Sequence, residues 1–398
     1  MKPTMKGKGG QYEQEIVALR RHLHRHPELS GEEYETSKKV QEQLEEHGIH
    51  FNSGYATTGV LGVVEGGKPG RTVALRADMD ALPIEEKNDH DFVSEVEGVM
   101  HACGHDAHTA MLVGAAWLLK EVEEELPGRV LLIFQPAEEM SPTGGAQPMM
   151  EEEVFSEHQP EAIFAQHVWP DLTVGQVGVR RREITGMSDN FEVVIQGASG
   201  HASKPHRTTD AIVVANQVIN ALQSIVSRDV NPLSASVLTI GKIEGGSRYN
   251  AVADTVTMQG TIRTLRQEIK ERVKDRFYSV VNGVAGSMEA TAHVRYWDGY
   301  PATVNTPEWA EQVCATSQAL LGDEATPEIE PSLGGEDFSR FLLEYPGAYF
   351  HLGVASPDDE EKKQLHDPRF GLDEAALPIG TELMAQLAVD ALYRLADR

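Results

Sequence analysis

The chain has 398 residues, more than one ordinary core of about 100–150 residues holds, and its length suits two domains. Its 62 acidic residues outnumber 35 Lys and Arg, and the formal charge of −27 argues against partners such as nucleic acids and anionic membrane surfaces. Two cysteines exclude a disulfide scaffold, and neither an export signal nor a membrane-length apolar run stands out, so we expect a cytoplasmic protein.

Two helices are expected at the start of the chain. Apolar residues recur at helical spacing before Pro27, which should end the first helix: Ile16, Leu19 and Leu23. Ser30 and Glu33 form an S-x-x-E pattern, which predicts a capping box for a second helix that Gly48 closes.

Strands and helices alternate over the next hundred residues. The apolar runs 60–64 and 72–77 flank a Gly-Gly-Lys-Pro-Gly turn and are expected to pair with each other. A helix over 107–120 precedes a strand over 130–134 and an apolar segment over 162–166. This alternation predicts an α/β domain with a mostly parallel sheet.

A different pattern fills the middle of the chain. Its elements are expected in the ferredoxin-like order β-α-β-β-α-β, over residues 191–196, 210–228, 236–243, 255–264, 267–284 and 290–297. Two more helices are expected over 309–321 and 379–395. We therefore expect a second domain over residues 186–298, inserted between the segments 1–185 and 299–398 of the first domain.

Side chains that can bind metals follow three of the predicted strands: Asp78 and Asp80, Glu138 and Glu139, and His167. Because the carboxyl ends of parallel strands meet at one edge of an open sheet, these groups should converge there. Cys103 and His105 stand just before the helix expected over 107–120. Cysteine, histidine and glutamate together suit zinc or manganese better than calcium, so a divalent metal site is predicted at this edge.

Each of these residues also has an ordinary structural explanation. A single Cys103 is more often a small buried hydrophobe, and a single His167 is more often a hydrogen-bonded core residue. Cys103 is also a candidate nucleophile with His101 or His105 as its base, although no third orienting group stands out. The convergence of all these groups at one edge favours the metal site.

A series of motifs runs along nearly the whole chain, among them HACGHD at 101–106 and FQPAEE at 134–139, with others at 20–24, 26–30, 75–83, 200–201, 249–250, 260–263, 334–338 and 365–368. In this order they resemble the metal-dependent amidohydrolases that include aminoacylases, hippurate hydrolase, indoleacetyl-amino-acid hydrolases and acetyldiaminopimelate deacetylase, relatives of the dizinc carboxypeptidases. The resemblance implies an α/β catalytic domain with an inserted α+β lid and dimerisation domain.

The resemblance further implies two divalent metal ions per chain, zinc or manganese, with cobalt or nickel as alternatives. Their ligands would be Cys103, His105, Glu139, His167 and His366. Glu138 would be the general base, and Asp80 would orient a ligand without binding metal itself. The dizinc carboxypeptidases have a histidine ligand where this chain has Asp78, and a bridging aspartate where it has Cys103, so the chain falls in the aminoacylase-like branch.

In the inserted domain the resemblance implies residues that bind substrate. His201 would stabilise an oxyanion and Asn250 would make a polar contact. Arg263 would pair with the substrate carboxylate, because a guanidinium binds a carboxylate through two hydrogen bonds. In the second segment of the first domain, Gly335 would let the backbone approach a ligand, although a tight turn is an equally ordinary use. In related dimers the histidine at the position of His201 reaches the active site of the neighbouring subunit, so we expect a homodimer or a higher homo-oligomer.

Four other residues that can bind metals are expected to have no role in the site. His22, His24 and His26 are interpreted as helix-end structure, and Cys314 as an inert core residue.

The sequence as a whole predicts an enzyme that hydrolyses N-acyl-amino acids, with acetyl, benzoyl or aryl-acetyl as the acyl group. An N-acetyldiaminopimelate-type deacetylase is the alternative within the class. A non-catalytic metal-binding relative is the alternative outside it, and the intact Glu138 argues against that alternative. The net charge would repel an anionic substrate unless Arg263 and the metals make the cleft locally positive, and a saline cytoplasm is a further hypothesis for the acidic excess.

Overall fold

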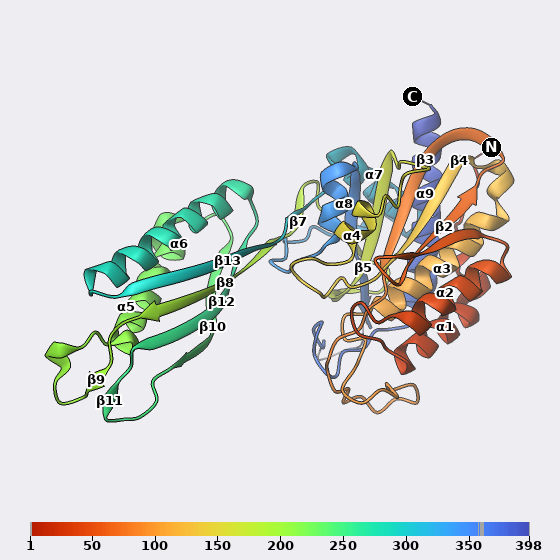
Figure 1. Ribbon diagram of the computed structural model, residues 1–398. Coiled ribbons are helices and arrows are strands. Elements are labelled where there is room, and N and C mark those ends of the chain that lie inside the picture. Colours follow the sequence, from red (N-terminus) through yellow and green to blue (C-terminus); the bar gives the residue numbers. More distant parts are fainter. Residues whose placement is uncertain (1, 357, 359–361, 398) are drawn as a thin grey trace. The chain divides into compact units, whose positions relative to one another are not determined.

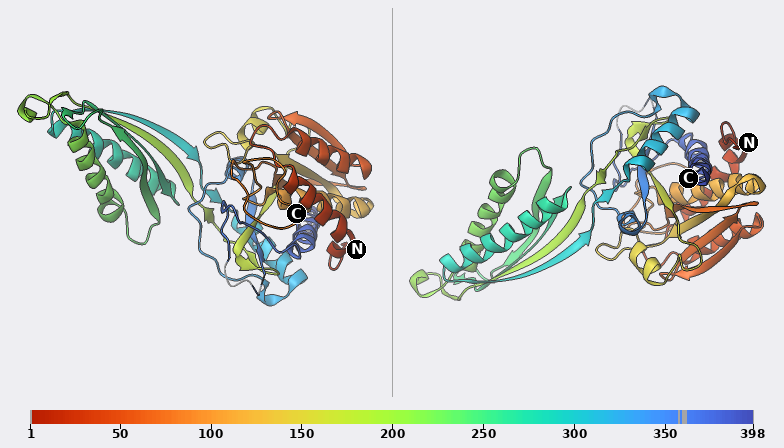
Figure 2. Two further views of the ribbon diagram at one scale, coloured as in Figure 1. Left: turned by 90° about the horizontal axis from the view of Figure 1, so that it is seen from below. Right: turned by 90° about the horizontal axis from the view of Figure 1, so that it is seen from above.

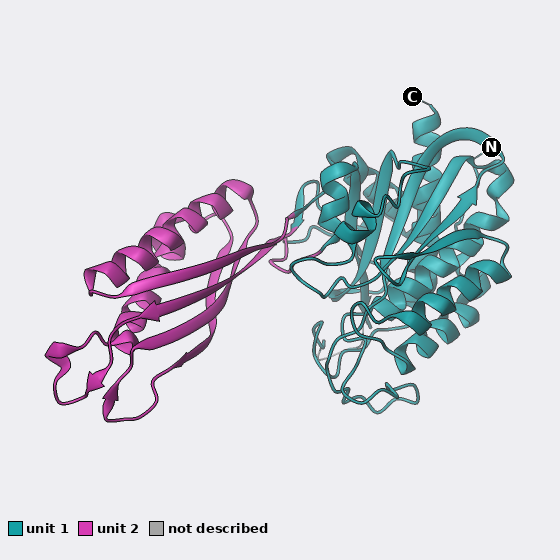
Figure 3. Cartoon of the chain, viewed as in Figure 1, with its two compact units in different colours: residues 1–184, 303–330, 337–398 teal, residues 185–302, 331–336 magenta. Residues whose placement is uncertain are grey.

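The computed structural model describes residues 2–356, 358 and 362–397, and the chain divides into two compact units (Figure 3). Unit 1 comprises Met1–Ile184, Thr303–Glu330 and Asp337–Arg398, and unit 2 comprises Thr185–Ala302 and Pro331–Glu336. Unit 2 is therefore an insertion in the chain of unit 1. Its roles as a lid and in dimerisation stay predictions.

A seven-stranded sheet forms the centre of unit 1 (Figure 1). In spatial order its strands are β1 His50–Tyr55, β2 Gly59–Glu65, β4 Pro127–Gln135, β3 Lys68–Asp78, β5 Ala162–Thr173, β15 Gly347–Ala355 and β6 Val177–Gly178. The four central strands β4, β3, β5 and β15 run parallel, and antiparallel strands flank them on both sides. The predicted α/β class with a mainly parallel central sheet is confirmed.

Helices cover both faces of this sheet, because its strands are apolar on both faces. The larger group comprises α1 Glu13–Arg25, α2 Tyr34–Glu46, α3 His105–Glu121, α7 Pro307–Leu321 and α9 Ala376–Ala396, and the smaller group α4 Ala146–Glu151 and α8 Phe338–Glu344. Along β3, Val73 and Leu75 pack with the larger group while Ala74 packs with the smaller, as strand alternation requires. No helix in the described part of the chain has the length and apolar composition needed to cross a membrane.

The predicted pairing of the strands on either side of the Gly-Gly-Lys-Pro-Gly turn is wrong. β4 lies between β2 and β3, and its Val130 pairs with Val64 on one side and with Val73 on the other. β3 begins against the start of β4, where Lys68 pairs with Pro127. The turn between β2 and β3 predicts that these two strands are neighbours, but β4, which follows some fifty residues later, lies between them. β4 takes this central position because it buries apolar side chains on both faces.

The predicted capping box at the start of α2 is also wrong. Neither Ser30 nor Glu33 caps the helix with its side chain. Ser30 Oγ donates to Asp80 Oδ2 at 2.6 Å, and the buried Glu33 carboxylate accepts hydrogen bonds from Thr58 Oγ1 and from the backbone N–H of Ala137. Both side chains thus tie this loop to the strand ends of the sheet instead of to the helix.

Unit 2 holds a four-stranded antiparallel sheet with two helices together on one face (Figure 2). The strands lie in the order β10 Ser236–Gly245, β12 Thr255–Thr264, β8 Met187–Gln196 and β13 Thr291–Tyr300. The helices α5 Ala211–Ser224 and α6 Gln267–Ser287 share one apolar core with this sheet. The elements follow one another along the chain as β-α-β-β-α-β, and a short ribbon of β9 Gly200–His201 and β11 Ala251–Val252 follows the end of β8.

Gly104 fixes the start of α3 against β5. Its φ of 82° is left-handed, and a Cβ at this position would lie 2.4 Å from Val168 Cγ2. The backbone conformation and the close approach each require glycine here.

We predict that Gly104→Ala lowers the free energy of unfolding by roughly 2–4 kcal/mol, because left-handed strain and overpacking add. Gly175→Ala is the matched control, since its φ is 89° but no atom lies within 4 Å of its Cβ position. That control should cost only about 1–2 kcal/mol of strain. Urea denaturation of both variants measures the difference, and equal losses would contradict the steric argument.

Candidate metal centre

The C-terminal edge of the parallel strands gathers the predicted ligands. In overlapping groups of three, ligand atoms lie within 4.8 Å of one another: Cys103, His105 and His167; Cys103, Glu139 and His366; and His105, Glu138 and Glu139. One strand boundary differs from the prediction, because β5 runs on to Thr173 and His167 lies inside it. The convergence expected from the ends of the strands is nevertheless present in the structure.

Cys103, His105 and His167 form a buried group. Cys103 Sγ lies 3.5 Å from His167 Nε2, and His167 Nδ1 donates to the carbonyl of Val168 at 2.7 Å. His105 Nδ1 lies 3.1 Å from Asp80 Oδ1, and its buried Nε2 has no hydrogen-bond partner among the described residues. Both rings are therefore held by Nδ1 and leave Nε2 for another ligand, which is how histidines bind metals in proteins.

Asp80 supports this group through His105. Its Oδ2 accepts hydrogen bonds from Ser30 Oγ at 2.6 Å and from the backbone N–H of Glu139 at 2.9 Å, while Oδ1 faces the imidazole. A carboxylate that fixes the ring of a ligand histidine is a common support of metal sites. These contacts suit the orienting role that the resemblance implies for Asp80.

Glu139 and His366 reach Cys103 from two separate loops. Glu139 Oε1 lies 3.0 Å from His366 Nε2. His366 has a left-handed φ of 67°, and its backbone N–H donates to the carbonyl of Ala102 at 2.8 Å, which holds the loop beside Cys103. The His366 side chain is 50% exposed, so this group faces solvent while the first group does not.

The carboxylates around the centre favour positive charge inside it. Burial alone would lower the pKa of His105, but Asp78, Asp80 and Glu139 raise it to about 10. Burial, together with the nearby carboxylates, holds the pKa of the Cys103 thiol well above its usual range. A divalent cation would supply the positive charge and satisfy the unpartnered Nε2, so the residues present fit a metal ion.

Three buried residues that carried no predicted role support the ligands: Arg76, His108 and Asp337. His108 Nδ1 donates to Asp78 Oδ1 at 2.5 Å, and its Nε2 accepts the backbone N–H of Val168 at 2.9 Å. The carbonyl of that same Val168 holds His167. All three stand in or beside the motifs of the sequence, but their supporting role is visible only from their hydrogen bonds in the structure.

Glu138 is oriented from the other side of the centre. Its carboxylate accepts the backbone N–H of Asp337 at 3.4 Å. The Asp337 carboxylate in turn accepts hydrogen bonds from Arg76 Nη2, Gln135 Nε2 and the backbone N–H of Gly145, at 2.8, 2.8 and 2.9 Å. The backbone that contacts Glu138 is thus anchored by a fully buried carboxylate.

Arg263 and Gly335, predicted to bind substrate, lie at one end of the sheet in unit 2. Arg263 on β12 pairs with Ser188 near the start of β8. A Cβ on Gly335 would lie 2.8 Å from Ser188 Oγ, so its backbone packs closely on the same serine. Arg263 Nε donates to Thr261 Oγ1 at 3.0 Å, and burial lowers the pKa of its guanidinium.

His201 and Asn250 lie beyond the other end of the same sheet. His201 belongs to β9, which follows Gln196 at the end of β8, and Asn250 directly precedes β11, its pairing strand. From Ser188 to Gln196 the strand advances eight residues, or about 27 Å at about 3.4 Å per residue. The two predicted pairs are therefore too far apart within one chain to contact the same small molecule.

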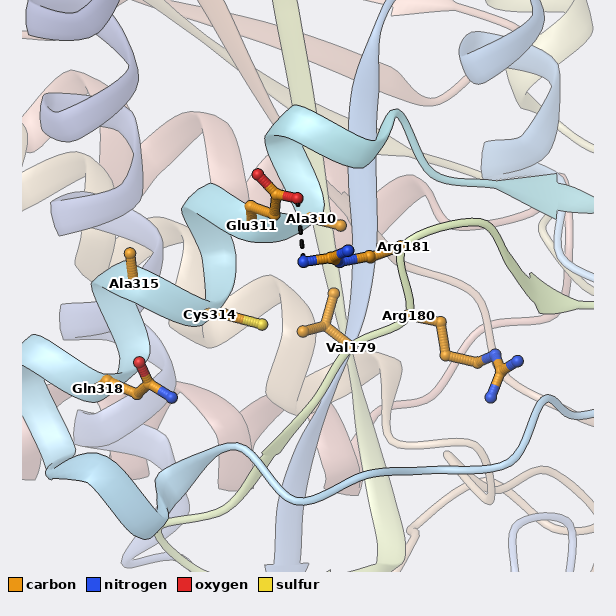
Figure 4. Close-up of a pocket in the computed structure, with 8 residues that line it drawn as sticks. All are labelled: Val179, Arg180, Arg181, Ala310, Glu311, Cys314, Ala315 and Gln318. Carbon is orange, nitrogen blue, oxygen red and sulfur yellow. Dashed lines mark ion pairs between the residues drawn. The ribbon is translucent and has the colours of Figure 1, made fainter.

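A cavity of about 200 Å³ in unit 1 is lined by none of these residues (Figure 4). Its walls come from α7 and the segment after β6: Val179, Arg180, Arg181, Ala310, Glu311, Cys314, Ala315 and Gln318. Arg181 Nη2 pairs with Glu311 Oε1 at 3.2 Å there. Cys314 is half-buried in this wall, and burial raises the pKa of its thiol, so it has no tendency to ionise.

Comparison with known proteins identifies the family. Residues 74–390 match the model described as peptidase family M20/M25/M40. Thermostable carboxypeptidase 1 of Saccharolobus solfataricus is 42% identical over 380 residues, 94% of each chain, and N-acetyl-L-cysteine deacetylase of Bacillus subtilis is 40% identical over 92% of this chain and 85% of its own. The crystal structure of Bacillus subtilis YxeP, described as a dinuclear metal-binding peptidase from the M20 family, matches with a TM-score of 0.84 and 35% identity, covering 96% of this chain and 99% of that one.

The chain therefore belongs to peptidase family M20/M25/M40. This confirms the family resemblance that the motifs indicated, together with the predicted fold class and the prediction of a hydrolase. The individual ligands and the substrate-binding residues remain predictions.

His351 lies beside the centre on β15, in register with His167. Its ring stacks on Trp169 with ring centroids 3.8 Å apart, and both ring nitrogens are buried without a hydrogen-bond partner in the described structure. Burial lowers the pKa of His351 to about 3. The ring is therefore neutral in the folded protein down to acidic pH.

We predict that His351 makes the fold acid-sensitive. Below its ordinary pKa of 6.5 this ring takes up a proton in the unfolded chain but not in the folded protein. The free energy of unfolding is therefore unaffected by this ring above pH 6.5 and decreases as the pH falls from 6.5 towards about 3. His351→Phe keeps a stacking ring and should gain stability relative to wild type across this window. Urea denaturation at a series of pH values measures it, with Trp169→Leu, which retains the histidine, as the control; parallel curves for His351→Phe and wild type would refute the assignment.

Proposed function

We propose that this chain is a cytoplasmic, metal-dependent amidohydrolase that cleaves N-acyl-amino acids into a carboxylate and a free amino acid. The observation that carries the proposal is the convergence of metal-binding side chains and the buried Glu138 at one sheet edge of a family member. The N-acetyl-L-cysteine deacetylase among its relatives supports an N-acyl amino acid as the substrate. Acetyl, benzoyl and aryl-acetyl groups are the acyl groups to be tested.

Two divalent ions, zinc or manganese, would be held by Cys103, His105, Glu139, His167 and His366. When bound, such ions polarise the amide carbonyl and lower the pKa of water toward about 7. The histidine rings keep their orientation through Asp80 and the carbonyl of Val168, so the chain prepares its nitrogen donors before an ion arrives.

Glu138 would act as the general base. Its carboxylate stands within the group that includes His105 and Glu139, and the backbone N–H of Asp337 holds one of its oxygens. From there it would take the proton of the attacking water and deliver it to the leaving amine.

The alternative in which Cys103 is the nucleophile has less support from the contacts. The imidazole nearest its thiol is that of His167, with Nε2 3.5 Å from Sγ, and no hydrogen bond joins Cys103 to His101 or His105, the two bases that the sequence suggested, among the described residues. The raised pKa of Cys103 also works against a free thiolate.

Arg263 would bind the carboxylate of the amino-acid part. Among the described residues no carboxylate lies within ion-pair distance of this partly buried guanidinium. A partly buried guanidinium outside ion-pair distance of every described carboxylate suits an anionic group of a ligand, which selects N-acyl amino acids over simple amides.

We predict that Glu138→Gln lowers kcat by about 10²–10⁴-fold, because a general base contributes that much, while bound metal stays unchanged. The assay is a panel of acetyl-, benzoyl- and indoleacetyl-amino acids with manganese, zinc, cobalt or nickel, alongside metal analysis. Glu157→Gln, an exposed glutamate downstream, is the matched control and should keep full activity. Wild-type turnover by Glu138→Gln would reject the proposed base, and a wild-type protein that hydrolyses no member of the panel would reject the function.

We further propose that the protein is a homodimer or higher homo-oligomer in which His201 serves the active site of a partner subunit. The support is the distance of about 27 Å along β8 that separates His201 from the Arg263 end of its own sheet. One small substrate cannot contact both in one chain, whereas two chains with closed symmetry can exchange such a residue reciprocally.

Mixing two inactive variants tests this exchange. After subunit exchange of His201→Ala with Glu138→Gln at equal amounts, half of the dimers are mixed and each has one complete site, so about a quarter of wild-type activity should return. The mixture of His201→Ala with a double variant carrying both changes is the control and should stay inactive. Absence of recovery in the first mixture would show that His201 works within its own chain.

A further inference from the structure

A second cluster of metal-binding side chains lies in unit 1, away from the predicted ligands. His24 near the end of α1 meets Glu86 and His90 from the loop after β3, and their ligand atoms lie within 4.8 Å of one another. Glu86 Oε1 is 3.1 Å from His24 Nε2 and 3.3 Å from His90 Nε2. The interpretation of His24 as helix-end structure accounts for its place on α1 but not for this arrangement.

These distances match the edges of a metal coordination sphere. In a tetrahedral zinc site with bonds of about 2.1 Å, neighbouring ligand atoms lie about 3.4 Å apart. Two imidazole nitrogens and one carboxylate oxygen form a donor set that binds zinc in many proteins. For the third edge, the two histidine nitrogens lie within 4.8 Å of each other.

Hydrogen bonding alone leaves the cluster crowded at one atom. Glu86 Oε1 faces three possible donors, because Asn88 Nδ2 also lies 2.9 Å away. A carboxylate oxygen has two lone pairs, and the contacts of His24 and Asn88 use them, so the His90 ring meets this oxygen without a hydrogen bond of its own. A cation that takes both histidine nitrogens and this oxygen as ligands removes the conflict.

Hydrogen bonds from outside the cluster orient two of its three side chains, His24 and Glu86. His24 Nδ1 lies 2.8 Å from the buried Asp106 Oδ2, which also accepts a hydrogen bond from Arg20 Nε at 2.8 Å. The other oxygen of Glu86 accepts the backbone N–H of Ser94 at 2.7 Å. The side chain of His24 is 1% exposed, that of Glu86 is 4% exposed and that of His90 is 28% exposed.

We propose that His24, Glu86 and His90 form an additional divalent-cation site, suited to zinc, that is separate from the Cys103 centre. The bound ion would cross-link α1 to the loop after β3. Through Lys87 N–H and Asn88 Nδ2, that loop contacts the carbonyls of Pro368 and Phe370. The site would therefore brace the loop that carries His366 and serve a structural purpose that does not depend on the reaction.

Cobalt substitution of the full-length protein distinguishes the two kinds of site. Co²⁺ bound by Cys103 gives a thiolate charge-transfer band, whereas a nitrogen and oxygen site gives only ligand-field bands in the visible range. We expect His90→Ala and Glu86→Gln each to bind one Co²⁺ ion fewer per chain than wild type, with the thiolate band retained. His26→Ala, an exposed histidine two residues after His24, is the matched control and should bind as many ions as wild type.

Two results would overturn the proposal. The first is equal cobalt content in His90→Ala, Glu86→Gln and wild type, and the second is a lost ion that takes the thiolate band with it. Cys103→Ala provides an independent arm, because without the thiolate band the added change His90→Ala should still remove one further Co²⁺ ion per chain, seen as a loss of ligand-field absorption. None of these readouts uses turnover, so a failure of the proposed amidohydrolase activity would be seen separately.

Discussion

The buried guanidinium of Arg76 is the interaction on which the geometry of the centre depends. It donates to Asp78 Oδ2 at 2.6 Å and to Asp337 Oδ1 at 2.8 Å, and the second of these contacts spans 261 positions of the chain. All three side chains are withdrawn from water, so none of the charges can be removed without leaving another uncompensated. Loss of one partner from such a buried group costs about 3–5 kcal/mol. The return of the chain after unit 2 is thus locked to β3 by charge as well as by packing.

The two carboxylates that Arg76 binds, Asp78 and Asp337, hold different parts of the centre in place. Asp78 holds His108, whose Nε2 holds the peptide of Val168, and the carbonyl of that peptide selects the tautomer of His167. Asp337 holds the backbone that contacts Glu138. The Arg76 guanidinium therefore helps to position both the proposed ligand His167 and the proposed base Glu138, although it contacts neither.

Part of the proposed centre could be predicted from the sequence because Asp80, Glu138 and Glu139 come just after apolar strands, and strand ends in a parallel sheet share an edge. The contacts of Ser30 and Glu33 could not, because the same two residues satisfy a helix-capping pattern that long-range hydrogen bonds override. The position of β4 between β2 and β3 could not be predicted from the sequence for a similar reason, since strand order depends on partners distant in the sequence. The separation of His201 from Arg263 follows only once the register and length of β8 are known.

The two ligand groups that share Cys103 differ in their access to water. The group with His105 and His167 is buried, whereas the group with Glu139 includes the half-exposed His366. If the proposed ions bind there, an ion in the buried group would leave only when the surrounding structure opens, while an ion in the outer group would exchange ligands with water directly. The proposed centre would then have unequal residence times, with one ion retained with the fold and the other exchanged with the divalent metals of the surroundings.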